Sequence, residues 1–196
     1  MKLLLTSKAF GNDIINEKIR NSLEIDIANA KVLFIPTALG GLYGYEKYLP
    51  QIIDFGFKEE NIIIFNENEA DKYKNLDIDV IYTCGGNTFT LLKLFKESGF
   101  VEELINYINK GVIYIGRSAG SHLLTKNIEH VLAFDDNDIG LEDYNGLGVF
   151  DGVLICHYNE EREQIYQELI RKNGYNVYTL TNDELLLVDE TKIKKI

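Results

Sequence analysis

The stretch Val112-Ile113-Tyr114-Ile115-Gly116-Arg117-Ser118-Ala119-Gly120-Ser121 decides the fold class that we expect for this chain. It is an apolar run of strand length followed at once by Gly-x-Ser-x-Gly. Continuous apolar runs are typical of strands that are buried on both faces, as in parallel sheets. A serine on a sharp turn between a strand and a helix needs glycines around it, because β-carbons would clash there. The stretch therefore predicts a buried strand, a turn that carries Ser118, and a helix just after it.

The rest of the chain alternates short apolar runs with amphipathic stretches. The runs that read as strands are residues 2–5, 31–35, 62–65, 80–83, 112–115, 152–156, 177–180 and 185–188. The stretches that read as helices begin after a cap at Asn12 and lie at residues 46–55, 89–97, 101–109 and 160–171. Pro50 implies that the helix at 46–55 either starts late or bends. This order predicts an α/β fold with a mostly parallel sheet flanked by helices. The length fits one domain over residues 1–196, with a long acidic connection at residues 127–146.

Composition excludes several classes of partner. The 20 basic and 31 acidic residues give a net charge of -11, which repels nucleic acid and anionic membranes. No apolar run approaches the roughly 20 residues of a membrane span. The two cysteines form no CxxC pair, so we expect no metal, no cofactor and a reducing cytoplasmic location. The oligomeric state stays open.

The Gly-x-Ser-x-Gly turn favours nucleophilic chemistry at Ser118. On such a turn the hydroxyl stands clear of the sheet, and the N–H of Ala119 points toward a developing oxyanion. Gly85-Gly86-Asn87-Thr88 ends the preceding strand, and neighbouring parallel strands share one edge at their carboxyl ends. Gly86 is therefore a candidate second oxyanion donor. The alternative is a plain turn in which Asn87 or Thr88 caps the next helix, and both interpretations can hold together.

A general base has to come from one of three histidines. His122 follows the serine by four residues and is expected inside the helix, turned away from it. His130 lies in the acidic connection. His157 follows the apolar run at residues 152–156, so we expect it at the carboxyl end of another strand of the sheet. That placement favours His157 as the base.

These motifs resemble the peptidase E family, which includes aspartyl dipeptidases and cyanophycinase-like enzymes. The resemblance rests on ordered matches between about residue 32 and residue 162, which cover most of the chain. The matching segments are Phe34-Ile35-Pro36-Thr37-Ala38, Gly85-Gly86-Asn87-Thr88, Gly116-Arg117-Ser118-Ala119-Gly120, Gly146-Leu147-Gly148-Val149 and Cys156-His157-Tyr158. Several motifs at family-like spacing are more specific than the serine turn alone.

The resemblance implies a sheet like that of class I glutamine amidotransferases, with a serine in place of the usual cysteine. It implies Ser118 as nucleophile, His157 as base, and Gly86 and Ala119 as oxyanion donors. The implied activity is hydrolysis of short peptides, which carry an N-terminal aspartate in the best-known branch. The expected partner is thus a small peptide substrate.

The third member of the triad is open. One part of the family places an acid in the loop after the turn, which points to Asp138. Another places a glutamate near the last strands, where Asn182 aligns best and Asp183 is next to it. Glu160, three residues after the histidine, is a further possibility. Asn182 carries no charge, so it cannot stabilise an imidazolium as a carboxylate does.

Two arginines are candidates for binding a substrate carboxylate. Arg117 stands inside the turn, where the family more often has an aromatic or small residue, and Arg162 lies where related enzymes often carry an arginine. An arginine fork suits a carboxylate. The alternatives are that Arg117 pairs with acids of residues 135–138 and that Arg162 is an exposed helix residue.

Two competing functions also remain open. The missing triad acid favours, to some extent, a non-catalytic or differently specific small-molecule binding protein on the same fold. Thiol chemistry at Cys84 or Cys156 is the less favoured one, because neither cysteine lies between the glycines of a nucleophile turn.

Overall fold

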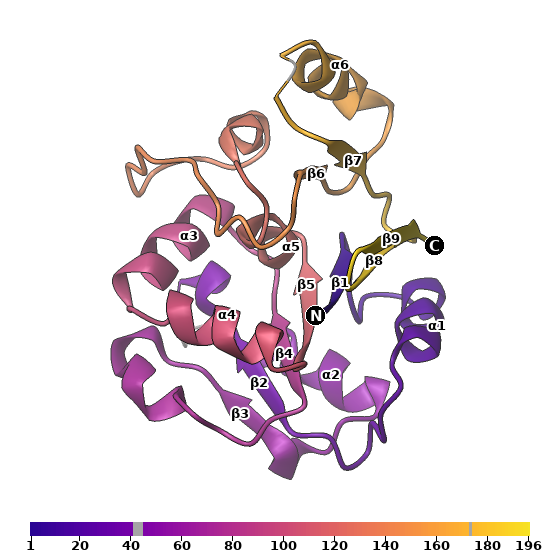
Figure 1. Cartoon of the computed structure of the whole chain (residues 1–196), viewed down its shortest axis with the longest axis vertical. Helices are drawn as coiled ribbons and strands as arrows, with labels where there is room; N and C mark the ends of the chain where they lie inside the picture. Colours follow the sequence, from indigo (N-terminus) through magenta and orange to yellow (C-terminus); the bar gives the residue numbers. More distant parts are fainter. Residues whose placement is uncertain (41–44, 173) are drawn as a thin grey trace.

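A seven-stranded sheet forms the centre of the molecule (Figure 1), in the order β3-β2-β4-β5-β1-β8-β9. The computed structural model describes residues 1–40, 45–172 and 174–196. The strands of this sheet are β1 (Lys2–Thr6), β2 (Val32–Ile35), β3 (Ile62–Ile64), β4 (Val80–Thr83), β5 (Ile113–Arg117), β8 (Leu185–Asp189) and β9 (Lys192–Lys195). The first five pair in parallel, and β8 and β9 join antiparallel beside β1. The predicted α/β class with a mostly parallel sheet is confirmed.

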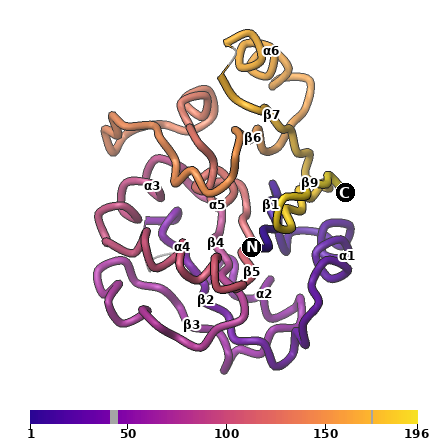
Figure 2. The backbone as a smooth tube through the Cα atoms, viewed as in Figure 1, coloured from indigo at the N-terminus to yellow at the C-terminus, as the bar shows by residue number. Residues whose placement is uncertain are grey.

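Helices cover both faces of this sheet. They are α1 (Asp13–Ser22), α2 (Leu49–Phe55), α3 (Thr88–Glu97), α4 (Val101–Asn109) and α5 (Ala119–Leu123), whereas α6 (Glu163–Arg171) lies away from this sheet. Short 3₁₀ helices are η1 (Thr37–Leu39), η2 (Tyr45–Lys47), η3 (Glu59–Asn61), η4 (Glu67–Tyr73), η5 (Glu129–Ala133) and η6 (Glu160–Arg162). The tube in Figure 2 shows α1 and α2 on one side of the sheet and α3, α4 and α5 on the other. The chain begins in β1 and ends in β9, two strands away, and its two ends lie at opposite ends of these strands, because Lys2 pairs with Asp189 whereas Lys195 pairs with Leu186.

Local sequence signals set the helix starts. The Asn12 side chain accepts the Ile15 N–H at 2.9 Å at the start of α1, and Asn87 caps α3 in the same way. Such caps satisfy N–H groups that have no partner within the helix. Pro50 lies in the first turn of α2, which therefore starts at Leu49, as the predicted late start requires.

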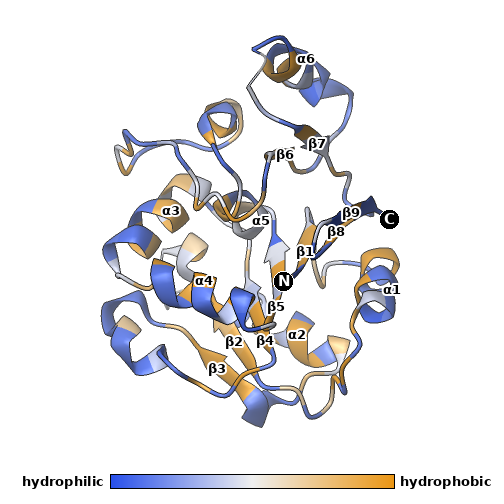
Figure 3. Cartoon of the chain, viewed as in Figure 1, coloured by the Kyte–Doolittle hydropathy of each residue, from blue (hydrophilic) through white to orange (hydrophobic). Residues whose placement is uncertain are grey.

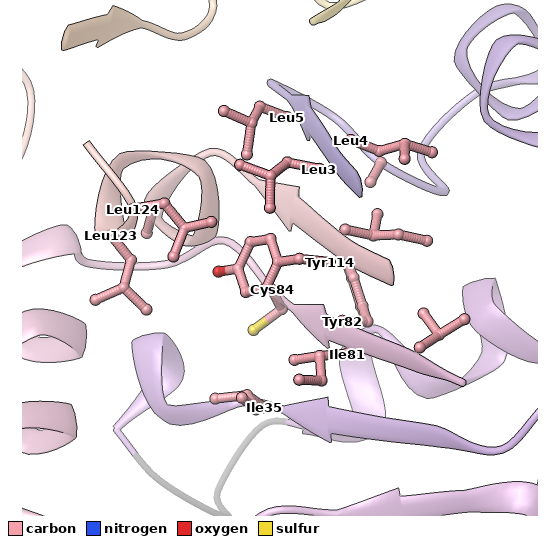
Figure 4. Close-up of a cluster of buried hydrophobic side chains, with 14 of the residues drawn as sticks. Leu3, Leu4, Leu5, Ile35, Ile81, Tyr82, Cys84, Tyr114, Leu123 and Leu124 are labelled. Carbon is pink, nitrogen blue, oxygen red and sulfur yellow. The ribbon is translucent and has the colours of Figure 1, made fainter. Parts of the chain in front are cut away.

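The core lies along the middle strands. Figure 3 shows apolar residues concentrated on the strands and polar residues on the outer sides of the helices. Figure 4 shows Leu3, Ile81 and Tyr114 from three neighbouring strands together with Leu123 and Leu124 at the end of α5. These side chains are fully buried. Their burial holds the carboxyl ends of β1, β4 and β5 at one edge.

The strand before His157 does not belong to the central sheet, contrary to the prediction. Strand β6 (Val153–Ile155) pairs only with β7 (Val177–Thr179), and the two form a separate parallel sheet near α6. Leu154 and Cys156 pack on the main core, whereas Val153 and Ile155 pack on Leu169 of α6. The run is therefore apolar throughout because it lies between two apolar layers, and the sequence pattern is the same as for an inner sheet strand.

Strand β9 was not predicted from the sequence. Strand β9 carries Lys192, Lys194 and Lys195, and its residues are exposed at the edge of the sheet. Lysines on an edge strand discourage pairing with other chains, and they leave no apolar pattern from which to predict a strand.

Candidate active site

Ser118 lies on a strained turn between β5 and α5. Its backbone has φ 49° and ψ -108°, and its N–H donates to Thr6 O at 2.9 Å. A β-carbon on Gly120 would lie 2.2 Å from Thr83 O, and one on Gly116 would lie 2.9 Å from the backbone of Ser121. Only glycine fits at both positions. The turn thus places the serine at the carboxyl end of β5, and a non-glycine residue in such a conformation costs about 1–3 kcal/mol.

His157 lies beside this serine. The Nε2 atom of His157 is 3.0 Å from Ser118 Oγ, and its Nδ1 atom is 2.6 Å from Asn182 Oδ1. The backbone of His157 has φ 54°, and its N–H donates to the buried Ser7 Oγ at 2.9 Å. Ser7 in turn donates to Leu180 O at 2.8 Å. The end of β1 therefore fixes the histidine backbone.

The contact with Asn182 decides which nitrogen of His157 carries the proton. An amide oxygen can only accept a hydrogen bond, so Nδ1 must donate. In the neutral imidazole Nε2 is then the unprotonated nitrogen, and it can accept the Ser118 hydroxyl proton. This is the tautomer that a general base for Ser118 requires.

The carboxylates proposed for the third position do not occupy it. Asp138 is exposed on its loop, and Glu160 is exposed in η6. Asp183 accepts a hydrogen bond from Asn12 Nδ2 at 2.9 Å. Of the described residues, only Asn182 hydrogen-bonds to Nδ1 of His157. The prediction of Asp138 is therefore wrong for this structure, as are its two carboxylate alternatives.

The pairing of β6 with β7 explains why Asn182 is the neighbour. The Tyr158 N–H donates to Leu180 O, and the Leu180 N–H donates to Ile155 O, each at 2.9 Å. The two short strands therefore end side by side, with His157 after one and Asn182 after the other. In the turn that follows β7, Asn182 faces the imidazole, and the next residue, Asp183, faces Asn12 at the start of α1.

Burial and nearby cations act on the imidazole. Burial is the largest effect and holds the pKa of His157 below its usual value. The hydrogen bond to Asn182 opposes this shift, whereas the charges of Arg162, Arg117 and Lys8 lower the pKa further. The imidazole is therefore neutral at neutral pH, which is the form that can accept a proton.

The glycine pair after β4 lies against the serine turn. A β-carbon on Gly85 would lie 3.3 Å from Ser118 Cβ. Gly86 has φ 154°, and a β-carbon on it would lie 2.2 Å from Ala38 O. Among the hydrogen bonds of the described residues, the N–H groups of Gly86 and Ala119 have no backbone acceptor. Gly86 is exposed at this edge of the sheet, whereas Ala119 is buried.

Arg117 does not pair with the acidic loop. Its Nη1 donates to Ala9 O at 2.9 Å and to Gln51 Oε1 at 2.7 Å. The guanidinium lies 4.4 Å from the centre of the Tyr48 ring. The predicted alternative, an ion pair with residues 135–138, is thus contradicted, and the side chain lies on the α2 side of the sheet.

Arg162 lies on the other side, next to β6. Its Nη1 donates to Cys156 O at 2.5 Å, and its guanidinium lies 3.7 Å from the centre of the Phe134 ring. The residue is part of η6 and is half-buried, so it is not the exposed helix arginine of the alternative interpretation. Its carbonyl partner directly precedes His157.

The remaining histidines and thiols lie away from this chemistry. His122 is buried and His130 is partly buried, with their ring centres 5.6 Å apart, and desolvation lowers the pKa of His130 to about 4. Burial raises the pKa of the Cys84 and Cys156 thiols to about 12, so neither forms a thiolate at neutral pH. Thiol chemistry is thereby disfavoured.

The described part of the chain contains no group of three or more His, Cys, Asp and Glu side chains arranged to hold a metal ion. Within the same ranges, no helix combines the length and apolar content needed to cross a membrane.

Curated relatives resemble the chain over about half to nearly all of its length. An uncharacterized peptidase of Listeria monocytogenes serovar 1/2a is 28% identical over 197 residues, covering 96% of this chain and 95% of the relative. Peptidase E of Citrobacter koseri is 32% identical over 106 residues, covering 48% of this chain and 44% of that protein.

Two solved structures share the fold. A candidate peptidase E protein from Listeria monocytogenes has a TM-score of 0.82 at 24% identity, covering 100% of this chain and 97% of that one. A peptidase from an acI-B1 Actinobacterium has a TM-score of 0.66 at 18% identity, covering 100% and 93%. At these identities the likeness concerns the fold.

The sequence model of peptidase family S51 matches residues 3–196. This match spans nearly the whole chain, and relatives named peptidase E agree with it. The resemblance to the peptidase E family is confirmed: the chain belongs to peptidase family S51 and is a serine-type peptidase.

Proposed function

We propose that this peptidase hydrolyses short peptides through an acyl-enzyme on Ser118, with His157 as general base and Asn182 as the group that orients the imidazole. The observation that supports this proposal most is the continuous chain of contacts, 3.0 Å from Ser118 Oγ to Nε2 and 2.6 Å from Nδ1 to Asn182 Oδ1. The strained turn and the neutral imidazole add to it.

The reaction follows from these positions. The Nε2 atom takes the Ser118 proton while Oγ attacks the peptide carbonyl carbon. The N–H groups of Gly86 and Ala119 hold the negative oxygen that forms. The imidazolium then gives its proton to the leaving amine, and the acyl group stays on Oγ. Water, deprotonated by the same nitrogen, releases the acid and restores the hydroxyl.

An asparagine in the third position changes the energetics of the base. Asn182 fixes the ring and the tautomer, but its neutral amide does not stabilise the imidazolium through a charge. The nearby cations Arg162, Arg117 and Lys8 disfavour the imidazolium further. We therefore expect a weaker base that works at lower pH than a Ser-His-acid triad would.

We further propose that the preferred substrates carry an N-terminal aspartate whose side chain is bound by Arg162. The family resemblance is one ground. The other is the position of Arg162, which stacks on Phe134 and is anchored one residue before the base. No carboxylate of the described residues lies within 4.0 Å of its guanidinium. Its remaining N–H groups are thus able to take a substrate carboxylate.

The test is a panel of dipeptides assayed with the wild type and Ser118→Ala. We expect Ser118→Ala to lose about 10⁴-fold or more in kcat while its thermal unfolding is unchanged. Covalent labelling by a fluorophosphonate, present in the wild type and absent in the variant, separates catalysis from the non-catalytic binding alternative. A variant with full rate on the best substrate would refute the serine mechanism.

A further inference from the structure

Arg117 is a cation without an anionic partner, beside the nucleophile of an acidic protein. Its hydrogen bonds to Ala9 O and Gln51 Oε1 both use Nη1 and go to neutral groups. A guanidinium has five N–H donors, so Nε and Nη2 still have N–H groups to donate, and the buried Tyr82 hydroxyl that interacts with the guanidinium is neutral as well. No carboxylate of the described residues lies within 4.0 Å of it, although the chain has a net charge of -11. The side chain is half-buried.

Gly85 packs against both Arg117 and Ser118. A β-carbon on Gly85 would lie 3.5 Å from Arg117 Cγ and 3.3 Å from Ser118 Cβ. A larger side chain at this position would therefore crowd the stem of Arg117 and the nucleophile. The orientation of Arg117 is fixed as well, because the Tyr48 ring covers one face of the guanidinium.

The two site arginines approach Ser118 from different sides. Arg162 is anchored on the carbonyl after β6, and Arg117 is anchored on α2 and on the segment after β1. In Figure 1, the β6–β7 pair with α6 and the helix α2 lie on opposite sides of the tip of β5. With the arginines anchored on different elements, one peptide can have its first residue toward Arg162 and its leaving residue toward Arg117.

We propose that Arg117 binds the free carboxylate of the leaving residue, so that the enzyme prefers dipeptides with an unblocked C-terminus. The inference rests on the proposed function, because it takes Ser118 as the attacking group. In a dipeptide only three covalent bonds separate the scissile carbonyl carbon from the C-terminal carboxyl carbon, a span of about 4 Å. The cation that reads this carboxylate must therefore lie next to the nucleophile, and Arg117 is its neighbour in the chain. Lys8, whose charge also acts on His157, adds to the positive potential there.

The experiment compares kcat/KM for a dipeptide with that for the same dipeptide as its C-terminal amide. It uses Asp and Ala as first residues, so an absent aspartate preference leaves the comparison intact. A charge-assisted contact corresponds to about a 10–100-fold preference for the free carboxylate in the wild type. We expect Arg117→Met to lose most of this preference and Arg117→Lys to keep part of it.

Arg20→Met is the matched control. Arg20 lies 4.5 Å above the Phe55 ring and donates to Phe55 O at 2.6 Å, so it has the same kinds of contact as Arg117 away from Ser118. Its loss should leave the preference for the free carboxylate unchanged. Thermal unfolding of all variants then separates a structural role from a binding role.

Two results would overturn the inference. One is a wild type that cleaves the acid and the amide equally well, which leaves the serine mechanism intact. The other is an Arg117→Met enzyme that loses rate on both substrates equally and unfolds at lower temperature, which makes the side chain a structural anchor. Calorimetric binding of the two ligands to Ser118→Ala gives the same comparison without turnover, so the inference stays testable when the proposed hydrolysis itself fails.

Discussion

Replacing Asn182 with aspartate tests the role of the residue that orients His157. The substitution puts a carboxylate where the amide oxygen now lies, 2.6 Å from Nδ1. The two charge centres would be about 4 Å apart, which corresponds to about 1 kcal/mol in water and about 4 kcal/mol at an effective dielectric constant of 20. Since one pKa unit is about 1.4 kcal/mol, the limits are about 0.7 and 3 units. Asn182 is exposed, so we expect a rise of about 1–2 units in the pKa of His157.

The sign of the effect on activity follows from the form that reacts. The neutral imidazole is the base, so activity is lost as pH falls through the pKa of His157. In the wild type burial holds this pKa below its usual value, and the acid limb of kcat/KM should lie below the usual histidine range near pH 6.5. In Asn182→Asp the acid limb should move to higher pH by about 1–2 units. The plateau at higher pH should not fall, because the variant base is stronger.

The assay is kcat/KM for one alanyl dipeptide with a free C-terminus from about pH 4 to about pH 9. Glu160→Gln is the control, since this carboxylate is exposed in η6 and does not contact the imidazole. It should leave the acid limb where it is. An acid limb that stays in place in Asn182→Asp, or that moves to lower pH, would refute the assignment of Asn182 as the partner of His157.

Three further predictions concern specificity, positioning and stability. Arg162→Met should slow aspartyl dipeptides about 10–100-fold more than alanyl ones, and equal losses in kcat/KM would contradict a role in reading aspartate. Ser7→Ala removes the buried partner of the His157 N–H and of Leu180 O. It should lower kcat with little change in KM and reduce the free energy of unfolding in denaturant by about 1–3 kcal/mol. An unchanged kcat would contradict a role of Ser7 in positioning His157. Desolvation lowers the pKa of His130 to about 4, so the unfolded state binds its proton first. The free energy of unfolding should therefore fall by about 2–3 kcal/mol as pH drops from about 6.5 to about 4. Stability that is flat across this window would exclude the linkage.

Much of the fold can be predicted from the sequence, because strands, tight turns and helix starts each require particular residue types nearby in the chain. The run at residues 112–115 is apolar since β5 is covered on both faces, and Gly116 and Gly120 are glycines since a β-carbon would meet backbone atoms. Asn12 and Pro50 indicated helix starts because the first N–H groups of a helix have no acceptor within it; asparagine supplies an acceptor, and proline has no N–H. These features identify the α/β class and place Ser118 on its turn.

The partners of the serine were a matter of tertiary structure. An apolar run indicates that a strand is buried, but it does not indicate which elements cover the strand. The run before His157 therefore has the pattern of a strand in the central sheet, although β6 pairs with β7 alone. Ser118 and His157 are 39 residues apart, and His157 and Asn182 are 25 apart. Contacts at such separations depend on how whole elements pack, and in the turn after β7 a shift of one residue decides between an amide and the carboxylate of Asp183. The sequence by itself therefore determined the elements and the turn that carries Ser118. The packing of distant segments placed the uncharged Asn182 beside His157 and turned Arg117 away from the acidic loop, because the positions of the backbones decide which side chains are neighbours.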